Sequence, residues 1–394
     1  MTSPRVIIDA RIAFGEAGGI ETVVEGLAEG FSHLPQNVMG NLNVTFLALP
    51  NWTTWLQSLQ PKPGMVLTVP SPPHVPSVTR QALGVARLAY HFGMASIPAS
   101  LRHYPDFQMN RLRPDLVHYP FQSNLLPSSR FVYHPHDLQH RHLPDAFTKR
   151  QRLTRDASYR SMCDLASVVC VASEWVERDL MSEYRLDPGR IRVVPLGPLM
   201  RTPQRTGALP VAELPQEFIF YPAVNWPHKN HATLMKALAL LRSKGVGVPL
   251  VLSGAETPDH PRLAELARRE GVSDLVTVLG FVDRETLWEV YERSTAVVIP
   301  TLFEASSLPI WEAFSMGKPV LAARVTSLPE QIGAAGLLFD PLDAQEMATC
   351  IERIWRSNDL RKKLGSAGMQ RAQRRSWVDV AADLVNVYRS ILDQ

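Results

Sequence analysis

The chain has 394 residues, 45% of them hydrophobic and 20% charged, with a formal net charge of +3. This composition is typical of a soluble globular protein, the length predicts more than one domain, and the small charge excludes a nucleic-acid coat protein. No run of eighteen apolar residues predicts a membrane-spanning helix, and three cysteines are too few for a disulfide framework, which favours a reducing, cytoplasmic location.

Short apolar runs alternate with amphipathic helical stretches along the first half of the chain. The opening residues lack the charged start and long apolar stretch of a signal peptide, so we expect none. Instead, RVIIDA is a predicted strand, followed by a glycine loop and the helical stretch IETVVEGLAEGF. Further predicted strands are PDLVHYP, FVYHPHD, SVVCVAS and RIRVVPLGP. This alternation is typical of a parallel sheet covered by helices.

The same pattern restarts after a predicted linker at about residues 201–215. The predicted strands here are EFIFYPA, VPLVLSGA, LVTVLGF, TAVVIPT and KPVLAA, with amphipathic helices between them. We therefore predict an α/β chain of two Rossmann-like domains, residues 1–200 and 201–375, whose parallel sheets face a cleft. A last helix within 376–394 is expected to cross back to the first domain. Ligands of such sheets bind at the carboxyl ends of the strands.

The stretch FEASSLPIWEAF places two acids around a predicted helix start. Glu304 lies in the loop after the strand VVIP, Ser307 is a candidate N-cap, and Glu312 lies about one turn into the helix. We expect the amides of Ser306, Ser307 and Leu308 to be free donors at the positive helix end, which suits a diphosphate. The flanking carboxylates suit sugar hydroxyls. Two solvated acids are the alternative, but Glu312 lies among apolar residues and so needs a partner.

A lysine precedes another predicted helix, in YPAVNWPHKNH. Lys229 lies at the helix start, where a positive charge is unfavourable unless an anion is bound there. We therefore favour an anion-binding lysine over a solvated one.

Glycine and histidine clusters mark the first half of the chain. Gly18 and Gly19, after the first strand, let the backbone approach a ligand closely, although tight turns use such pairs as well. The absence of a GxGxxG motif argues against nicotinamide binding. The segment VYHPHDLQHRHLP holds four histidines, whose spacing does not form a convincing metal-ligand set. We take His134, His140 and His142 as surface or structural residues.

The segment PTLFEASSLPIWEAFSMGKPVLAARVTSLPEQIGAAGLLFDP resembles the donor-binding segment of family-4 glycosyltransferases. These are retaining, nucleotide-sugar-dependent enzymes with the GT-B fold. Their pair of glutamates separated by seven residues matches Glu304 and Glu312. The resemblance implies that the first contacts the donor sugar and the second the ribose hydroxyls. The family usually has glycines where this chain has Ala305 and Ser307, so a backbone with positive φ would be costlier here.

The resemblance extends to other candidate residues. It implies that Lys229 holds the donor diphosphate, with His228 where the family usually has arginine, and that a second cation there depends on pH. It places His136 at the active-site cleft, where we assign it to sugar or acceptor contact, with turn capping as the alternative. Val282 follows the strand near which relatives bind the base, although a structural role is equally open. Gly18 and Gly19 resemble the family's glycine loop.

Together, these features predict a retaining glycosyltransferase that moves a hexose from a nucleotide-diphosphate sugar to a hydroxyl acceptor, either a glycan or a lipid-linked one. Lys229, Glu304 and His136 are the candidate catalytic residues. The resemblance implies that no metal or other cofactor is needed. Three alternatives stay open: a GT-B-fold sugar-nucleotide epimerase, a sucrose-synthase-like or phosphorylase-like enzyme of the same fold, and a non-catalytic protein that binds sugar nucleotides.

One basic stretch suggests a further partner. Residues 61–114 hold six lysines and arginines and a single acid, Asp106. Within them, Arg80, Arg87 and His91 share one face of a predicted helix, roughly opposite an apolar face. We hypothesise a weak peripheral contact of residues 80–94 with the inner membrane face through this basic ridge. The alternative is that the apolar face packs on the core and the arginines are solvated.

Overall fold

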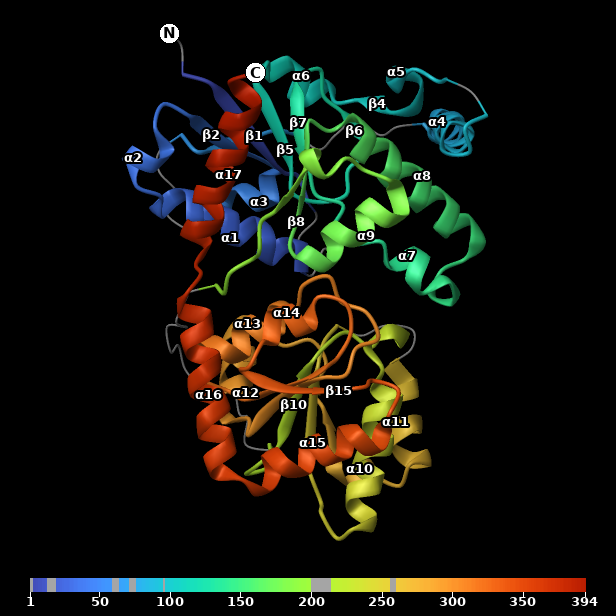
Figure 1. The fold of residues 1–394 in the computed structure, drawn as a ribbon, viewed down its shortest axis with the longest axis vertical. Coiled ribbons are helices and arrows are strands. Elements are labelled where there is room, and N and C mark those ends of the chain that lie inside the picture. The colour runs from blue at the N-terminus through green and yellow to red at the C-terminus, as the bar shows by residue number, and fades with distance from the viewer. Residues whose placement is uncertain are drawn as a thin grey trace. The chain divides into compact units, whose positions relative to one another are not determined.

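A computed structural model describes residues 3–12, 19–58, 64–70, 76–94, 96–199, 214–255 and 260–394. The chain divides into two compact units: Met1–Gly197 together with Ser376–Gln394 is unit 1, and Pro198–Arg375 is unit 2. Each unit holds one large parallel sheet with helices around it (Figure 1). The predicted α/β class with two Rossmann-like domains is thereby confirmed. Most of the expected linker, residues 201–213, lies outside the described residues.

Unit 1 contains a seven-stranded sheet in the order β3-β2-β1-β5-β7-β8-β9, and all neighbouring strands are parallel. The strands are β1 Arg5–Ala10, β2 Asn43–Ala48, β3 Val66–Thr68, β5 Leu116–Tyr119, β7 Arg130–Tyr133, β8 Val168–Val171 and β9 Ile191–Val193. The short β4 (Tyr104–Pro105) and β6 (Leu125–Leu126) pair separately. The sequence predicts five of the seven sheet strands and misses β2 and β3.

Nine α-helices surround this sheet in the described part of residues 1–197. They are α1 Gly19–His33, α2 Gln36–Met39, α3 Pro50–Ser58, α4 Ser77–His91, α5 Ala99–Arg102, α6 Phe107–Leu112, α7 Gln139–His142, α8 Lys149–Leu165 and α9 Glu174–Tyr184. The buried strands are almost wholly apolar, as expected for a parallel sheet covered on both faces.

The last helix of the chain, α17 (Trp377–Leu392), belongs to unit 1 and packs against α1 (Figure 1). A Cβ atom on Gly26 would lie 1.9 Å from the Trp377 ring, and one on Gly30 would lie 2.1 Å from the Trp377 carbonyl oxygen. Close approach of the two helices therefore requires glycine at both positions. Further along α17, Tyr388 is buried and its hydroxyl lies 2.6 Å from His118 Nδ1.

Helix α4 turns its basic face inward and its apolar face outward, which is the reverse of what the basic-ridge hypothesis requires. Arg87 is 8% exposed and donates to the Arg102 carbonyl oxygen at 2.9 Å, and His91 Nε2 lies 3.0 Å from Asp156 on α8. Val85 and Phe92, on the predicted apolar face, are instead 67% and 57% exposed. The predicted exposed basic ridge is therefore wrong for Arg87 and His91, because carbonyl and carboxylate partners hold both side chains inside unit 1.

Unit 2 contains a six-stranded parallel sheet in the order β12-β11-β10-β13-β14-β15. The strands are β10 Ile219–Pro222, β11 Leu250–Ser253, β12 Val276–Val278, β13 Ala296–Ile299, β14 Val320–Ala323 and β15 Gly336–Phe339. The helices are α10 His231–Ser243, α11 His260–Arg269, α12 Arg284–Arg293, α13 Leu308–Ser315, α14 Leu328–Ile332, α15 Ala344–Arg356 and α16 Asn358–Gln373. The sequence predicts every strand except β15.

Among the described residues, no helix combines the length and the apolar character that crossing a bilayer requires.

The α1–α17 contact gives a stability prediction. We expect Gly30→Ala to lower the free energy of unfolding of unit 1 by about 1–3 kcal/mol, because the new methyl group meets a backbone carbonyl that cannot move aside. Urea unfolding measures the change. The matched control is Gly84→Ala in α4, where an added Cβ has no atom within 4 Å; there, the better helix propensity of alanine predicts a gain of about 0.5–1 kcal/mol. Equal effects at both positions would contradict the packing argument.

Candidate active site

The strand order of unit 2 places the predicted donor residues at one edge of the sheet. The chain leaves β10 toward β11 and β12 on one side, whereas β13, β14 and β15 lie on the other. β10 and β13 are therefore adjacent strands, and the chain leaves them toward opposite sides of the sheet. Open parallel sheets bind ligands at such a position. Lys229 lies in the segment after β10, and Glu304 lies in the loop after β13. Folding thus brings together two residues that are 75 positions apart.

Asn230 fixes the segment after β10. Its backbone is left-handed, with φ 59°, at the junction of the short 3-10 helix Pro227–Lys229 and α10. Its buried Nδ2 donates to the carbonyl oxygens of Pro300 at 2.9 Å and Pro341 at 2.8 Å. One side chain therefore ties together the loops that follow β10, β13 and β15, and the direction of Lys229 is set by this corner.

Lys229 and Glu304 form the central contact of the site. Lys229 Nζ donates to Glu304 Oε2 at 2.8 Å, and the two side chains are 21% and 19% exposed. The pair is partly buried but still reachable from solvent. Each charge is the partner of the other in this state, so an incoming anion has to share or displace the carboxylate at Lys229.

The Glu304 backbone is held from the neighbouring loop after β14. Its carbonyl oxygen accepts from Thr326 Oγ1 at 2.5 Å and from Ser327 Oγ at 2.9 Å. Thr326 itself is left-handed, with φ 47°, which is uncommon for a β-branched residue and indicates local strain. The carboxylate of Glu304 is therefore mounted on a rigid loop.

At the start of α13, one of the three backbone amides that we expected to be free is already hydrogen-bonded. The predicted helix is confirmed at Leu308–Ser315, but the Ser307 amide donates to Gln331 Oε1 at 2.9 Å. Gln331 Nε2 returns a hydrogen bond to the Ser307 carbonyl oxygen at 2.6 Å, and Ser307 is 2% exposed. The prediction of a free Ser307 amide is therefore wrong. Within the described chain, the amides of Ser306 and Leu308 have no protein acceptor and remain available to a ligand.

The residues that replace the usual glycines take ordinary backbone conformations. Ser307 has φ −100°, and Ala305 is not among the described residues with positive φ. This loop therefore carries no left-handed strain from the missing glycines.

Glu312 has the partner that its apolar surroundings require. Tyr291, a buried residue of α12, donates its hydroxyl to Glu312 Oε2 at 2.6 Å. Burial, together with the Glu312 charge, raises the pKa of Tyr291 well above its usual value, so the phenol remains a donor. This hydrogen bond orients the carboxylate at the helix start.

His228 does not supply the second cation considered above at neutral pH. Burial, and then the neighbouring charge of Lys229, lowers the pKa of His228 to about 3. Its carbonyl oxygen accepts from the Leu302 amide at 2.7 Å and from Thr301 Oγ1 at 3.2 Å, so the residue joins the loops after β10 and β13.

Val282 lies at the same edge of the sheet, in the segment between β12 and α12. It is half-buried, and the preceding Gly280 is left-handed, with φ 69°. The Gly280 carbonyl oxygen accepts from the Gly254 amide at 2.9 Å, which connects this segment to the one after β11. Val282 is therefore placed beside the carboxyl ends of the strands, as the sequence predicts.

His136 belongs to unit 1, in the loop between β7 and α7. Its backbone is left-handed, with φ 61°, and burial lowers its pKa to about 4. Its Nε2 atom is buried and has no hydrogen-bond partner among the described residues. Strain combined with an unsatisfied ring nitrogen is typical of a functional position. Gly19 begins α1, whereas Gly18 lies outside the described residues.

A basic cavity beside α7 was not singled out from the sequence. It measures about 450 Å³, and Lys149 and Arg152 line it from the first turn of α8. Arg141, on α7, also lines it and pairs with Glu183 at 3.0 Å. The sequence does carry a signal for this cavity: KRQR places three cations at a helix start. A helix start repels positive charge, so three cations there are unusual. Because Asp156 and Glu183 line the cavity as well, its lining carries charges of both signs.

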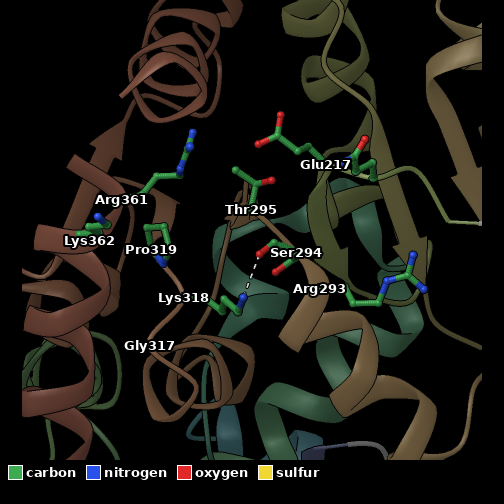
Figure 2. Close-up of a pocket in the computed structure, with 10 residues that line it drawn as sticks. Glu217, Arg293, Ser294, Thr295, Gly317, Lys318, Pro319, Arg361 and Lys362 are labelled. Atoms are coloured by element: carbon green, nitrogen blue, oxygen red, sulfur yellow. Dashed lines mark hydrogen bonds between the residues drawn. The ribbon is translucent and has the colours of Figure 1, made fainter. Parts of the chain in front are cut away.

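A separate cavity, of about 390 Å³, lies in unit 2, at the edge of its sheet opposite the Lys229–Glu304 pair. Ser294 and Lys318, which precede β13 and β14, and Arg361 of α16 line it. Figure 2 shows Lys318 directed toward Ser294, and its Nζ donates to the Ser294 carbonyl oxygen at 3.1 Å. Because this cavity lies at the amino ends of the strands, it is separate from the Lys229–Glu304 site.

Within the described ranges, no group of three or more histidine, cysteine, aspartate or glutamate side chains is arranged to hold a metal ion. His134 and His140 are buried, and His142 pairs with Asp179 at 2.7 Å, so all three have places in the packing of unit 1.

Comparisons with known proteins concern the family and the fold. Residues 65–197 match the family described as Glycosyltransferase Family 4, and residues 210–371 match Glycosyl transferases group 1. O-antigen chain mannosyltransferase B of Escherichia coli is 28% identical over 261 residues, which cover 64% of this chain and 68% of that protein. MMP alpha-(1->4)-mannosyltransferase of Mycolicibacterium hassiacum is 31% identical over 221 residues, which cover 54% and 52%.

Among solved structures, sucrose-phosphate synthase from Thermosynechococcus elongatus has a TM-score of 0.68 at 20% identity, over 99% of both chains. This likeness establishes the fold. The two family matches lie one in each unit, and the chain belongs to the family-4 glycosyltransferases with the GT-B fold. The matched segment spans about half of the Mycolicibacterium relative.

Proposed function

We propose that the chain is a retaining glycosyltransferase that moves a hexose from a nucleotide-diphosphate sugar to a hydroxyl of a glycan or lipid-linked acceptor. The observation that carries the proposal is the Lys229–Glu304 pair at the switch point of the unit 2 sheet, beside the start of α13. The names of the two mannosyltransferase relatives support mannose as the hexose.

The proposed roles follow from the contacts. The donor diphosphate binds at Lys229 and at the amides of Ser306 and Leu308, because all three groups can donate hydrogen bonds to an anion. Glu304, released from its ion pair as Lys229 turns to phosphate, accepts hydrogen bonds from the sugar. Glu312, already oriented by Tyr291, accepts from the ribose hydroxyls. Val282 contacts the base through its backbone.

The reaction breaks the bond between the anomeric carbon and the donor phosphate oxygen and forms a bond to the acceptor oxygen. Negative charge grows on the leaving phosphate, where Lys229 stabilises it. That phosphate oxygen takes the proton of the acceptor hydroxyl on the same face, so the anomeric configuration is retained. The His136 ring is neutral at neutral pH, and one of its nitrogens hydrogen-bonds to the Pro120 backbone, so the unpartnered Nε2 accepts a hydrogen bond from a hydroxyl of the sugar or acceptor.

The cysteines support a cytoplasmic location. Cys163, Cys170 and Cys350 are buried free thiols, as expected in a reducing compartment.

The product of the reaction tests the proposal. We expect incubation with GDP- or UDP-mannose and glycan acceptors to release nucleoside diphosphate and to give an α-linked product, with the configuration read by NMR. An inverted linkage would contradict retention. An epimerised sugar nucleotide with no released diphosphate would indicate an epimerase. Donor binding, seen as a thermal shift, without turnover or slow donor hydrolysis would indicate a non-catalytic binding protein.

Lys229→Ala is expected to lower kcat by about 10²–10³-fold, since removing one stabiliser of developing charge typically costs that much. The unfolding midpoint should fall modestly, because Glu304 loses its partner while its side chain is only 19% exposed. Steady-state kinetics at saturating donor measure the effect. Lys236→Ala, an exposed lysine on α10, is the matched control and should keep parental turnover. Parental kcat in Lys229→Ala would remove this lysine from the mechanism.

Activity is expected to survive an excess of EDTA, because Lys229 and the helix-start amides supply the positive field at the diphosphate. Initial rates before and after chelation check this. A loss of rate that added Mg²⁺ or Mn²⁺ restores would show that a metal shares this role.

A further inference from the structure

Helix α4 has its polar and apolar faces reversed relative to an ordinary helix of a globular protein. Val78, Ala82, Val85, Ala89 and Phe92 fall within an arc of about 80° at 100° per residue. We call this row the α4 stripe. Val78, Val85 and Phe92 are 75%, 67% and 57% exposed. Helices of globular proteins normally turn such a face to the core.

The opposite face of α4 is held inside unit 1 by polar contacts. Arg87 donates to the Arg102 carbonyl oxygen at 2.9 Å, Tyr90 donates to Asp164 at 3.1 Å, and His91 lies 3.0 Å from Asp156. Rotating the helix to bury the stripe would break all of these contacts. The outward direction of the stripe is therefore fixed by the structure.

Further exposed apolar residues follow α4 in the chain, and one of them, Leu101, lies on α5, which packs against α4. Of the eleven large hydrophobic residues that are exposed in the described chain, six lie between Val78 and Phe107. Besides the three of the stripe, they are Met94, Leu101 and Phe107, with exposures of 68%, 59% and 58%. Such a concentration marks an interaction surface, whereas single exposed residues do not.

Charge around this surface favours an anionic partner. The only acid among residues 76–114 is Asp106, which is 2% exposed and paired with Arg11 at 2.5 Å. Arg111 and Arg113 are exposed in the same segment, and Arg111 lies one turn from Phe107 on α6, whereas the exposed Arg80 lies roughly opposite the stripe on α4. The exposed surface of the segment thus combines apolar side chains with positive charge and no carboxylate.

The shape of the stripe favours a lipid surface over a second copy of the chain. A helix of 15 residues gives a strip about 22 Å long and about 10 Å wide. A stable protein interface needs roughly 800 Å² from each partner, several times this area. An interfacial helix needs only one apolar face, and basic residues nearby add affinity for anionic lipid.

We propose that the α4 stripe, with Leu101 and Phe107, inserts into the surface of a membrane that contains anionic lipid. The contact is made by the apolar face, and the basic groups that remain exposed strengthen it. Lipid binding by this surface does not depend on catalysis, so it can be tested separately from the proposed transfer reaction.

Vesicle co-sedimentation of the full chain tests the proposal. We expect binding at low ionic strength to vesicles of phosphatidylcholine and phosphatidylglycerol in equal amounts, and weaker binding to phosphatidylcholine alone. The double variant Val85→Ser/Phe92→Ser should lower partitioning at least about tenfold, because two apolar side chains no longer enter the lipid. Arg111→Gln should lower it about two- to fivefold, and only at low salt.

The matched control is Leu342→Ser, an equally apolar residue that is 76% exposed in unit 2 and should leave binding unchanged. Circular dichroism verifies that each variant is folded, as expected for side chains that are more than half exposed. The proposal is overturned by an absence of vesicle binding, by equal binding to both lipid compositions, or by parental binding in the double variant. It is also overturned if the chain dimerises without lipid and the double variant abolishes the dimer, since a second copy then covers the stripe.

Discussion

The candidate donor site depends on the left-handed corner at Asn230. A parallel sheet brings the ends of β10, β13 and β15 to one edge but does not fix the loops that leave them. The Asn230 amide does so by donating to Pro300 and Pro341 from a backbone with φ 59°, a conformation that asparagine tolerates better than most residues. The preceding residue, Lys229, is thereby directed at Glu304. Without this corner, the lysine would be a flexible side chain on a mobile turn.

The Lys229–Glu304 ion pair also explains how two charged side chains can be accommodated in a half-buried site. Each would otherwise pay a desolvation penalty alone. Nearby, His228 is neutral because of burial, and the Glu304 backbone is held by uncharged hydroxyl groups. In the proposed reaction, the donor diphosphate would meet the Lys229 cation and two backbone amides, and its binding would free the Glu304 carboxylate for hydroxyl groups.

The sequence predicts most of this arrangement because its signals are local. Apolar runs bounded by turn residues predict the strands, and Ser307-Leu308-Pro309 predicts a helix start; both are confirmed. The Ser307 amide could not be predicted, because its acceptor, Gln331, is 24 residues away and its approach depends on the placement of α14. Strand β3 was missed for another reason: it is three residues long, too short for a clear period.

Helix α4 shows a limit of a more general kind. Periodicity separates the faces of a helix, and here it separates Arg87 and His91 correctly from Val85 and Phe92. It does not say which face turns inward, since that depends on partners elsewhere in the chain. Here the Arg102 carbonyl oxygen and Asp156 hold the polar face inside unit 1, although Arg87 Nε and His91 Nδ1 have no hydrogen-bond partner among the described residues. The apolar face is then left exposed, and its hydrophobic free energy is available to a partner outside the chain.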